Sequence, residues 1–363
     1  MLTFSSSLGP PTLRSLQKRC FLVLFIKVVL YNVTMTNIDI LAIGDITTDA
    51  FIKIHDADIH CTVEEKDCKL CFNFGDKIPY DSLDITVAVG NSANAAVSAS
   101  RLGLNSSILA YVGNDQNGKE CIAELKKNGV DTTHVRTEDD KKTNYHFVLW
   151  YKVDRTILVK HEDFSYNLGE INPPKWIYLS SVGQSSILFH NQIAEFIEKN
   201  PETKLAFQPG TFQIKLGAET LSNIYKNTEI FFCNVEEAQT ILHSESRDLP
   251  TILRGIEKLG PKITIITDGI EGAYAYDGVN TWFMPVYPKD PYERTGAGDA
   301  FASTVVSCLV MGKTLEEALT WGPVNSMSVV SFVGAQKGLL TQEKIKEYLE
   351  KAPENYKLKK YNI

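Results

Sequence analysis

The amino-acid sequence predicts an α/β protein built around a mainly parallel β-sheet with helices on both faces. Apolar runs of strand length alternate with longer stretches of helical periodicity from residue 38 onwards. Repeated strand–helix units of this kind form parallel sheets whose two faces are covered. The chain of 363 residues, 44% hydrophobic and 22% charged, is long enough for one large domain with a small appendage.

The alternation begins with a buried-type strand at 38–43, which ends at Gly44. An irregular stretch at 55–86 follows and contains strand-like pieces such as 71–74. Residues 87–103 predict a loop that turns into a helix of small residues. We then expect a strand at 107–112, a helix at 118–128, and a β-hairpin formed by 144–151 and 155–161.

From residue 176 the alternation becomes regular. We expect short apolar strands at 176–179, 204–207, 230–233 and 262–267. Helices are expected at 186–199, 235–242, 300–311, 314–332 and 342–351. Ligands of such sheets bind beyond the carboxyl ends of the parallel strands, so we expect the functional residues at that edge.

The two ends of the chain lie outside this pattern. Residues 1–37 carry Arg14, Lys18, Arg19 and Lys27 but no acidic residue. Their apolar run at 20–31 is too short and too charged for a membrane span. We interpret 1–37 as a targeting segment or, with Met35 as the true start, as an overlong gene model, and we favour the second. The α/β domain is expected at 38–350, with 351–363 as a C-terminal tail.

Charge and cysteine usage narrow the class of protein. The net charge of −7 and the absence of a long basic run argue against nucleic acid as a partner, and no segment predicts membrane insertion. Seven scattered cysteines argue against a secreted disulfide framework, so we expect a cytoplasmic protein. Cys68 and Cys71 form a C-x-x-C motif near Cys61 and His60, but without a second such motif we expect reduced thiols there and not a zinc site.

The most informative segment is Glu293-Arg294-Thr295-Gly296-Ala297-Gly298-Asp299. Small residues at the start of a helix leave backbone N–H groups open to an anion such as phosphate. A carboxylate at that place, Asp299, suits a base that takes a proton from an attacking hydroxyl. Together they predict phosphoryl transfer to an alcohol. The alternative is an ordinary glycine-rich loop in which Asp299 caps the helix.

Four further motifs have both a functional and a structural interpretation. Asp49, just after the first strand, is either a ligand for vicinal hydroxyls or a surface turn residue. Gly90, Asn91 and Asn94 open the small-residue helix, either as a hydroxyl-binding turn or as a packed, capped one. Asn234 and Glu237 follow a strand and fit a helix cap equally well. Thr267, Gly269 and Gly272 form a loop that suits phosphate or a plain hairpin.

Taken in order, these motifs resemble those of the ribokinase-like (PfkB) carbohydrate kinase family. Residues 295–301 are similar to the end of its D-T-x-G-A-G-D signature, and 90–103 to its G-G-x-x-x-N and A-x-x-x-A-R-L-G patterns. Asn234 and Glu237 match its N-x-x-E motif, and 267–272 its T-x-G-x-x-G loop. The resemblance covers roughly residues 38–350. The chain has no G-x-x-x-x-G-K-[ST] loop and no protein-kinase H-R-D or D-F-G set.

The resemblance implies a ribokinase-like, doubly wound sheet with a small β lid formed from about 50–86 and 144–161. It implies a kinase that uses ATP and Mg²⁺ to phosphorylate a hydroxymethyl group. Asp299 would be the general base, and Gly296, Ala297 and Gly298 would hold the transferring phosphoryl group. The substrate would be bound by Asp49, Gly90, Asn91 and Asn94. The nucleotide would be bound by Asn234, Glu237, Thr267, Gly269, Gly272 and Asn325, with Glu237 ordering hydrated Mg²⁺.

Several points stay open at this stage. A free sugar is the expected substrate, a nucleoside is the alternative within the same fold, and a non-catalytic binding or scaffold protein is the alternative in a different class. A homodimer through the lid is also expected. Glu293 and Arg294 stand where the family usually has Asp and Thr, and that Asp helps to bind a potassium-type ion in several members. Arg294 pairs with Glu293 or reaches the phosphates; the sequence does not decide between these.

Overall fold

The computed structural model describes residues 38–61, 68–152 and 154–361. The interpretation of 1–37 as a targeting segment or an overlong gene model therefore falls outside the described residues. Residues Ile38–Ile363 form one compact unit. None of the helices in the described ranges is both long enough and apolar enough to cross a membrane.

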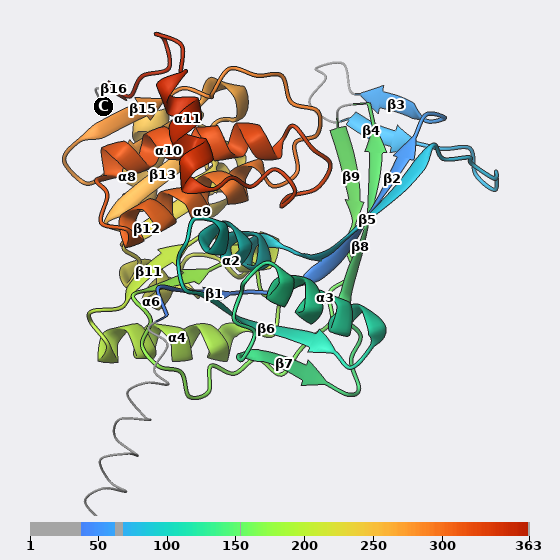
Figure 1. The fold of residues 1–363 in the computed structure, drawn as a ribbon, viewed down its shortest axis with the longest axis horizontal. Helices are drawn as coiled ribbons and strands as arrows, with labels where there is room; N and C mark the ends of the chain where they lie inside the picture. Colours follow the sequence, from blue (N-terminus) through green and yellow to red (C-terminus); the bar gives the residue numbers. More distant parts are fainter. Residues whose placement is uncertain (1–37, 62–67, 153, 362–363) are drawn as a thin grey trace, which may run out of the picture. The chain divides into compact units, whose positions relative to one another are not determined.

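A ten-stranded sheet forms the centre of the described chain (Figure 1). Its strands, in spatial order, are β16 (Lys359–Lys360), β15 (Thr281–Met284), β14 (Ala273–Tyr276), β13 (Ile263–Thr267), β12 (Ile230–Asn234), β11 (Lys204–Phe207), β10 (Trp176–Leu179), β1 (Ile40–Ile43), β6 (Ser106–Gly113) and β7 (Val135–Glu138). The seven strands from β13 to β7 are parallel, and the three at the other edge are antiparallel. The carboxyl ends of the parallel strands therefore lie together at one edge, as the sequence predicts.

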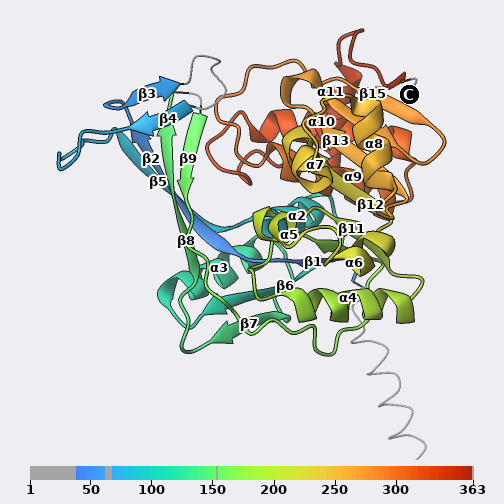
Figure 2. The same ribbon diagram turned by 180° about the vertical axis from the view of Figure 1, so that it is seen from behind.

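Helices cover both faces of this sheet (Figures 1 and 2). One face packs against α4 (Ile187–Lys199), α5 (Thr211–Leu216), α6 (Ser222–Lys226), α7 (Val235–Leu242) and α8 (Leu249–Glu257). The other packs against α2 (Asn91–Arg101), α3 (Gln116–Lys127), α9 (Ala297–Val310), α10 (Leu315–Val329) and α11 (Gln342–Glu350). Alternate residues of β1 serve the two cores, with Leu41 and Ile43 on one side and Ile40 and Ala42 on the other.

A second, small sheet stands at one end of the large one (Figure 1). Its spatial order is β5 (Ser82–Val89), β2 (Thr47–Ile54), β8 (Asn144–Tyr151) and β9 (Asp154–Leu158). The expected β-hairpin is present as β8 and β9, whereas β2 was not predicted as a strand because Thr-Thr-Asp at its start reads as a polar turn. A further hairpin, β3 (Asp58–Cys61) and β4 (Cys68–Cys71), extends from the small sheet.

The cysteine prediction is partly wrong. Cys61 and Cys68 are directly opposite one another in the β3–β4 hairpin and form a disulfide. The sequence spacing did not reveal this register, because the hairpin itself was not predicted. Cys71 and the three buried cysteines of the core are free thiols. No cluster of three or more potential metal ligands occurs within the described residues.

The C-terminal segment is also different from its prediction as a tail. β16 pairs with β15, and the side chain of Tyr356 is buried against the large sheet's core. Its hydroxyl donates a hydrogen bond of 2.6 Å to the carbonyl oxygen of Thr320 on α10. These residues therefore close one edge of the domain instead of lying beyond it.

Candidate active site

The glycine-rich turn before α9 is shaped by close packing against the chain behind it. Gly296 has φ 81°, and a Cβ atom there would lie 2.4 Å from Cβ of Ala335, so only glycine fits. α9 begins at Ala297, and its first backbone N–H groups have no intrahelical acceptor. At Gly298 a Cβ atom would meet nothing closer than 4.0 Å, at Nε2 of Gln208. The helix start is therefore open on the side of Gly298, where an anion can approach its N–H groups.

Three side-chain amides hold the carboxylate of Asp299 in the first turn of α9. Oδ1 accepts hydrogen bonds from Nδ2 of Asn91, at 2.9 Å, and from Nε2 of Gln208, at 3.1 Å. Oδ2 accepts one from Nδ2 of Asn94, at 2.7 Å. Burial raises the pKa of Asp299 above its ordinary value, and the three amides partly oppose that rise because they stabilise the ionised form. Asp299 is thus oriented as a weakly solvated base.

Both polar atoms of the Asn94 side chain are engaged by other residues of the protein. Its side-chain oxygen accepts a hydrogen bond of 3.0 Å from Nε2 of Gln336, which also donates to the carbonyl oxygen of Ala88 at 2.7 Å. Asn94 is only 4% exposed. The contacts of Asn94 thus favour a role in positioning Asp299, and direct binding of the substrate by Asn94 stays a prediction. Asn91 differs, because it is partly exposed and lines a cavity.

Gly90 has a structural reason for being glycine. Its φ is 108°, and a Cβ atom would lie 2.7 Å from the carbonyl oxygen of Asp45. Glycine is therefore required here by the protein's own backbone, at the turn that joins β5 to α2, and binding of a substrate by Gly90 stays a prediction. The turn nevertheless places Asn91 and Asn94 on the side of α2 that faces α9.

Two cavities adjoin at the start of α9. The first, of about 410 Å³, we call the apolar cavity, and the second, of about 280 Å³, the polar cavity. They share six lining residues, namely Asn234, Thr267, Arg294, Ala297, Gly298 and Phe301. Two ligand groups could therefore meet at the glycine-rich turn, one entering from each side.

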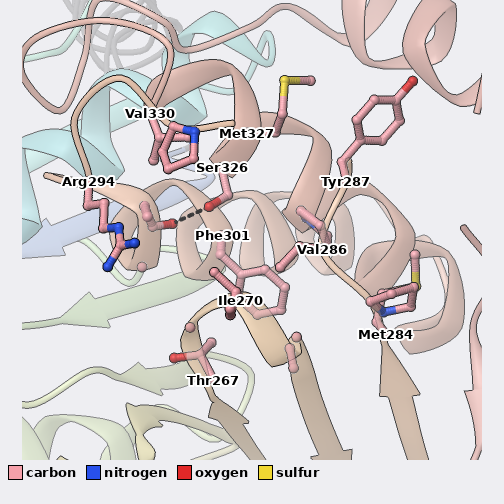
Figure 3. Close-up of a pocket in the computed structure, with 18 of the residues that line it drawn as sticks. Thr267, Ile270, Met284, Val286, Tyr287, Arg294, Phe301, Ser326, Met327 and Val330 are labelled. Atoms are coloured by element: carbon pink, nitrogen blue, oxygen red, sulfur yellow. Dashed lines mark hydrogen bonds between the residues drawn. The ribbon is translucent and has the colours of Figure 1, made fainter. Parts of the chain in front are cut away.

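Figure 3 shows the apolar cavity, with Arg294 at one end and Met284 and Tyr287 at the other. Thr267, Gly269 and Gly272 all line it; that they bind a nucleotide stays a prediction. Gly272 has φ 116°, and a Cβ atom there would lie 2.5 Å from the carbonyl oxygen of Met284, which explains the glycine. The flat apolar lining next to a charged end suits a planar ring with a polyanionic tail.

Asn325 lies outside this cavity. It is fully buried, donates a hydrogen bond of 2.8 Å to Oγ1 of Thr304, and accepts one of 2.9 Å from the backbone N–H of Leu340. It therefore joins α10 to neighbouring segments, and the prediction that it borders the nucleotide is not met. Ser326 and Met327, next to it on α10, line the cavity instead.

The polar cavity holds Asp299 together with Asn234 and Glu237. These last two form a capping box at the start of α7: Asn234 Oδ1 accepts from the Glu237 N–H at 2.8 Å, and Glu237 Oε2 accepts from the Asn234 N–H at 2.9 Å. Burial raises the pKa of the Glu237 carboxyl, and the nearby charge of Asp299 adds to that rise. The capping and cavity-lining interpretations thus both hold for this pair.

Asp49 lies on β2 and lines neither cavity. Its Oδ1 is 3.3 Å from Nδ1 of His146, the residue directly opposite on β8. A second histidine, His161, connects this pair to Asp45. The ring of His146 packs against that of His161, and Nδ1 of His161 is 3.3 Å from Oδ2 of Asp45. Oδ1 of Asp49, Nε2 of His146 and Nδ1 of His161 are buried without hydrogen-bond partners among the described residues. Such atoms are suited to bind a hydroxyl-bearing ligand.

Comparison with known proteins identifies the family of this chain. Residues 86–342 match the family model described as pfkB family carbohydrate kinase. The chain belongs to the pfkB family of carbohydrate kinases. It is therefore a phosphotransferase with an alcohol group as acceptor, of the sugar and nucleoside kinase class.

Individual relatives agree with the family assignment. The chain is 26% identical to a ribokinase from Haemophilus influenzae over 72% of this chain and 87% of that protein. It is 24% identical to a nucleoside kinase from Methanocaldococcus jannaschii, over 72% and 85% of the two chains. Its fold is similar to that of a ribokinase II from E. coli, whose structure was solved with ATP and Mg²⁺, with a TM-score of 0.70 and 18% identity over 86% and 99% of the chains.

The sequence interpretation missed three residues of this pfkB kinase site. Gln208 follows β11, and its Oε1 also accepts a hydrogen bond from the hydroxyl of Tyr178. Gln336 holds Asn94 from a loop after α10. Arg155, on β9, lines the polar cavity together with Asp299. No local motif marks any of them, but the position of Gln208 at the carboxyl end of a parallel strand was a usable signal.

Proposed function

We propose that this kinase transfers the γ-phosphoryl group of ATP to a hydroxymethyl group of a small free sugar. The observation that carries the proposal is the carboxylate of Asp299, held by three amides at the open start of α9 where the two cavities adjoin. Nucleotide in the apolar cavity would place its phosphates at this helix start. Asp299 would accept the proton of the attacking hydroxyl.

The backbone N–H groups of Ala297, Gly298 and Asp299 would bind the oxygens of the transferring phosphoryl group. Fixed donors of this kind stabilise developing charge without reorganisation, and losing one typically costs about 3–4 kcal/mol of barrier. Arg294 lines both cavities and is placed to neutralise phosphate charge. Asn234 and Glu237 supply oxygen donors of the type that Mg²⁺ prefers. Bound there, the ion would neutralise charge on the phosphates.

A sugar is favoured over a nucleoside by the chemistry around Asp49. Asp49, His146 and His161 each have a buried polar atom without a hydrogen-bond partner among the described residues, although Asp49 and His161 are also in charge pairs at 3.3 Å. Such groups can bind the hydroxyls of a sugar. The ring of Phe212 packs edge-on against His161, at 5.1 Å between ring centroids. This edge-on contact does not itself form a stacked aromatic platform for a base.

The test is a screen of free sugars and nucleosides for ATP-dependent release of ADP by the purified protein. We expect turnover with one or more free sugars and little with nucleosides. Turnover with nucleosides alone would show that the substrate is a nucleoside and not a sugar. A protein that binds ATP but phosphorylates neither class would support the non-catalytic alternative.

The small sheet is proposed to act as the lid, and its outward face as a homodimer interface. Four residues that are directly or diagonally in register share that face, and each is about half exposed: Leu83, Ile85, Phe147 and Leu158. A contiguous group of half-exposed apolar side chains on a free sheet face is typical of a protein contact. Light scattering on the protein and on a Phe147→Glu variant would show a dimer for the first and a monomer for the second. A cytoplasmic location, with no membrane or nucleic-acid partner, remains part of the proposal.

A further inference from the structure

Glu293 is a buried carboxylate at the turn that precedes α9. Only 2% of it is exposed. Its Oε1 accepts hydrogen bonds from the backbone N–H of Thr295, at 2.8 Å, and from the hydroxyl of Thr295, at 2.6 Å. Its Oε2 is buried and has no hydrogen-bond partner among the described residues. A carboxylate in this position is costly unless a positive charge lies nearby.

The positive charge comes from the small sheet. Nη1 of Arg155, on β9, lies 3.8 Å from Oε1 of Glu293. Arg294 is the next residue along the chain from Glu293, but it is exposed and directed along the apolar cavity (Figure 3). The structure shows no pairing of Arg294 with Glu293: the guanidinium paired with Glu293 belongs to Arg155 on β9. The other possibility, that Arg294 reaches the phosphates, stays part of the proposed function.

The same strand pair meets this turn at a second point. Trp150 is directly opposite Arg155 in the β8–β9 register. Its ring packs edge-on against Tyr292, with 5.4 Å between ring centroids. Tyr292 immediately precedes Glu293. The small sheet therefore contacts residues 292–293 through one aromatic pair and one charge pair, and a change in the angle of this sheet would move both contacts together.

Arg155 also faces the chemistry. It lines the polar cavity with Asp299 and with the glycine-rich turn, its side chain is 28% exposed, and its Nε has no partner among the described residues. A guanidinium carries five N–H donors in a planar fork, so it can pair with a carboxylate on one edge and with a phosphoryl oxygen on the other. Burial raises the pKa of Asp299, and the positive charge of Arg155 in the same cavity partly opposes that rise.

We propose that Arg155 is a catalytic residue that the small sheet delivers to the phosphoryl group, and that its charge pair with Glu293 takes the place of an alkali-metal ion at this turn. The inference rests on the proposed kinase function. When the small sheet closes over the site, the guanidinium of Arg155 reaches the γ-phosphate, and Glu293 fixes the orientation of that guanidinium. Glu293 in turn holds Thr295, so the position of the lid and the shape of the glycine-rich turn are coupled.

The same contacts decide whether an alkali-metal ion fits at Glu293. Such an ion needs several oxygen ligands that are not already committed to another cation. Oε1 of Glu293 already accepts two hydrogen bonds and faces Arg155. A second positive charge beside the guanidinium would be repelled by it. Only Oε2 of Glu293, which has no hydrogen-bond partner among the described residues, is left for such an ion, and the ion would share this carboxylate with the guanidinium. Glu293 therefore fits a guanidinium better than an alkali-metal ion.

The experiment is a double-mutant cycle with Arg155→Gln, Glu293→Gln and the double variant, with kcat and both KM values measured for each. We expect each single variant to lose roughly ten- to a hundredfold in kcat, the effect of a lost charge-assisted hydrogen bond. The double variant should lose no more than the worse single one, because the residues act as a pair. Additive losses, or an active Arg155→Gln variant, would overturn the proposal. Arg155→Lys keeps the charge without the fork and should recover part of the loss.

Lys160→Gln is the matched control, because Lys160 is a cation just beyond β9 that is exposed and pairs with Glu162. It should leave kcat and both KM values unchanged. The wild-type rate should also be the same, within about twofold, in sodium, potassium or tetramethylammonium chloride, since a bound guanidinium needs no exchangeable ion. Strong activation by potassium would contradict the inference.

A binding measurement separates this inference from the proposed function. By calorimetry, Arg155→Gln should bind a non-hydrolysable ATP analogue at least about tenfold more weakly than the wild type, a loss of about 1.4 kcal/mol. It should bind ADP equally well, because ADP lacks the γ-phosphate. This readout needs no acceptor. If no sugar or nucleoside is phosphorylated, the proposed function fails while the binding result still decides on Arg155; equal analogue binding by both proteins would overturn the inference alone.

Discussion

The side-chain amide of Asn94 donates a hydrogen bond of 2.7 Å to Oδ2 of Asp299, and so joins the starts of α2 and α9. This contact brings together two motifs that are 205 positions apart in the sequence. Asn94 is in turn fixed by Gln336, so a chain of amides orients Asp299. The motifs at the starts of α2 and α9 therefore converge on one carboxylate.

Asn94→Ala should reduce kcat by about tenfold or more while ATP affinity changes little. The lost hydrogen bond to a charged group corresponds to about 1.5–3 kcal/mol. Asn94 contacts Asp299 and not the apolar cavity, so its effect should appear in turnover. Saturation kinetics for both substrates measure this. Asn223→Ala, at an exposed asparagine of α6, is the control. A variant with normal kcat and weak ATP binding would contradict the positioning role.

The rate of phosphoryl transfer should fall at acidic pH, and the midpoint of this acidic limb of the pH–rate profile should lie above 3.8, the ordinary pKa of an aspartate. Burial raises the pKa of Asp299. A base acts only when ionised, so activity is present above this raised pKa and is lost as the pH falls through it. In Asn94→Ala one donor to the ionised form is gone, which raises the pKa further and moves the limb to higher pH. A limb that stays in place would show that another group titrates.

Asp49→Ala should separate acceptor binding from nucleotide binding. Asp49 lies on β2 beside His146, whereas every described residue of the apolar cavity lies at or after Asn234. We expect the sugar KM to rise at least tenfold, which needs only about 1.4 kcal/mol, with ATP affinity unchanged. Asp58→Ala, at an exposed carboxylate of β3, is the control. Weaker ATP binding with an intact sugar KM would mean that the two sites are assigned the wrong way round.

β8 and β9 should become protected from hydrogen exchange when sugar and a non-hydrolysable ATP analogue are both present. β9 is an edge strand with mostly exposed side chains, so it opens easily when no ligand holds it. Mass spectrometry of deuterium uptake over residues 144–158 gives the answer. Equal uptake with and without the two ligands would count against a lid in this sheet.

The parts of the fold that the sequence predicted are those with strong local patterns. β10, β11 and α7 have the expected bounds, because each is a short apolar run or a capped amphipathic helix with a clear break at either end. α8 was missed because Pro250 near its start reads as a helix breaker, although it stands where a proline is tolerated. β2 was missed because the long-range pairing with β8, and not its own sequence, makes it a strand.

The residues of the candidate site fall into the same two groups, those with a local sequence pattern and those placed by tertiary contacts. Asp299 and the glycine-rich turn could be predicted, because anion binding at a helix start leaves a local signature. The partners that orient Asp299 could not all be assigned: Asn94 carried a motif, but only the packing of α2 against α9 shows that it faces the base. Gln208 and Arg155 reach the polar cavity from separate elements and carry no motif at all. Their roles depend on tertiary contacts.

The central claim is that Asp299 is the base for transfer of the γ-phosphoryl group to a primary hydroxyl of a free sugar. The direct measurement is ³¹P NMR of the products formed from ATP and the sugar that the screen selects, with the wild type and Asp299→Asn compared at equal concentration. We predict a phosphate monoester on the hydroxymethyl carbon for the wild type. We predict a rate roughly 10²–10⁴-fold lower for the variant, with ATP affinity retained. Sugar phosphate formed at a near-normal rate by Asp299→Asn, or ADP and free phosphate without a sugar phosphate from the wild type, would contradict the account.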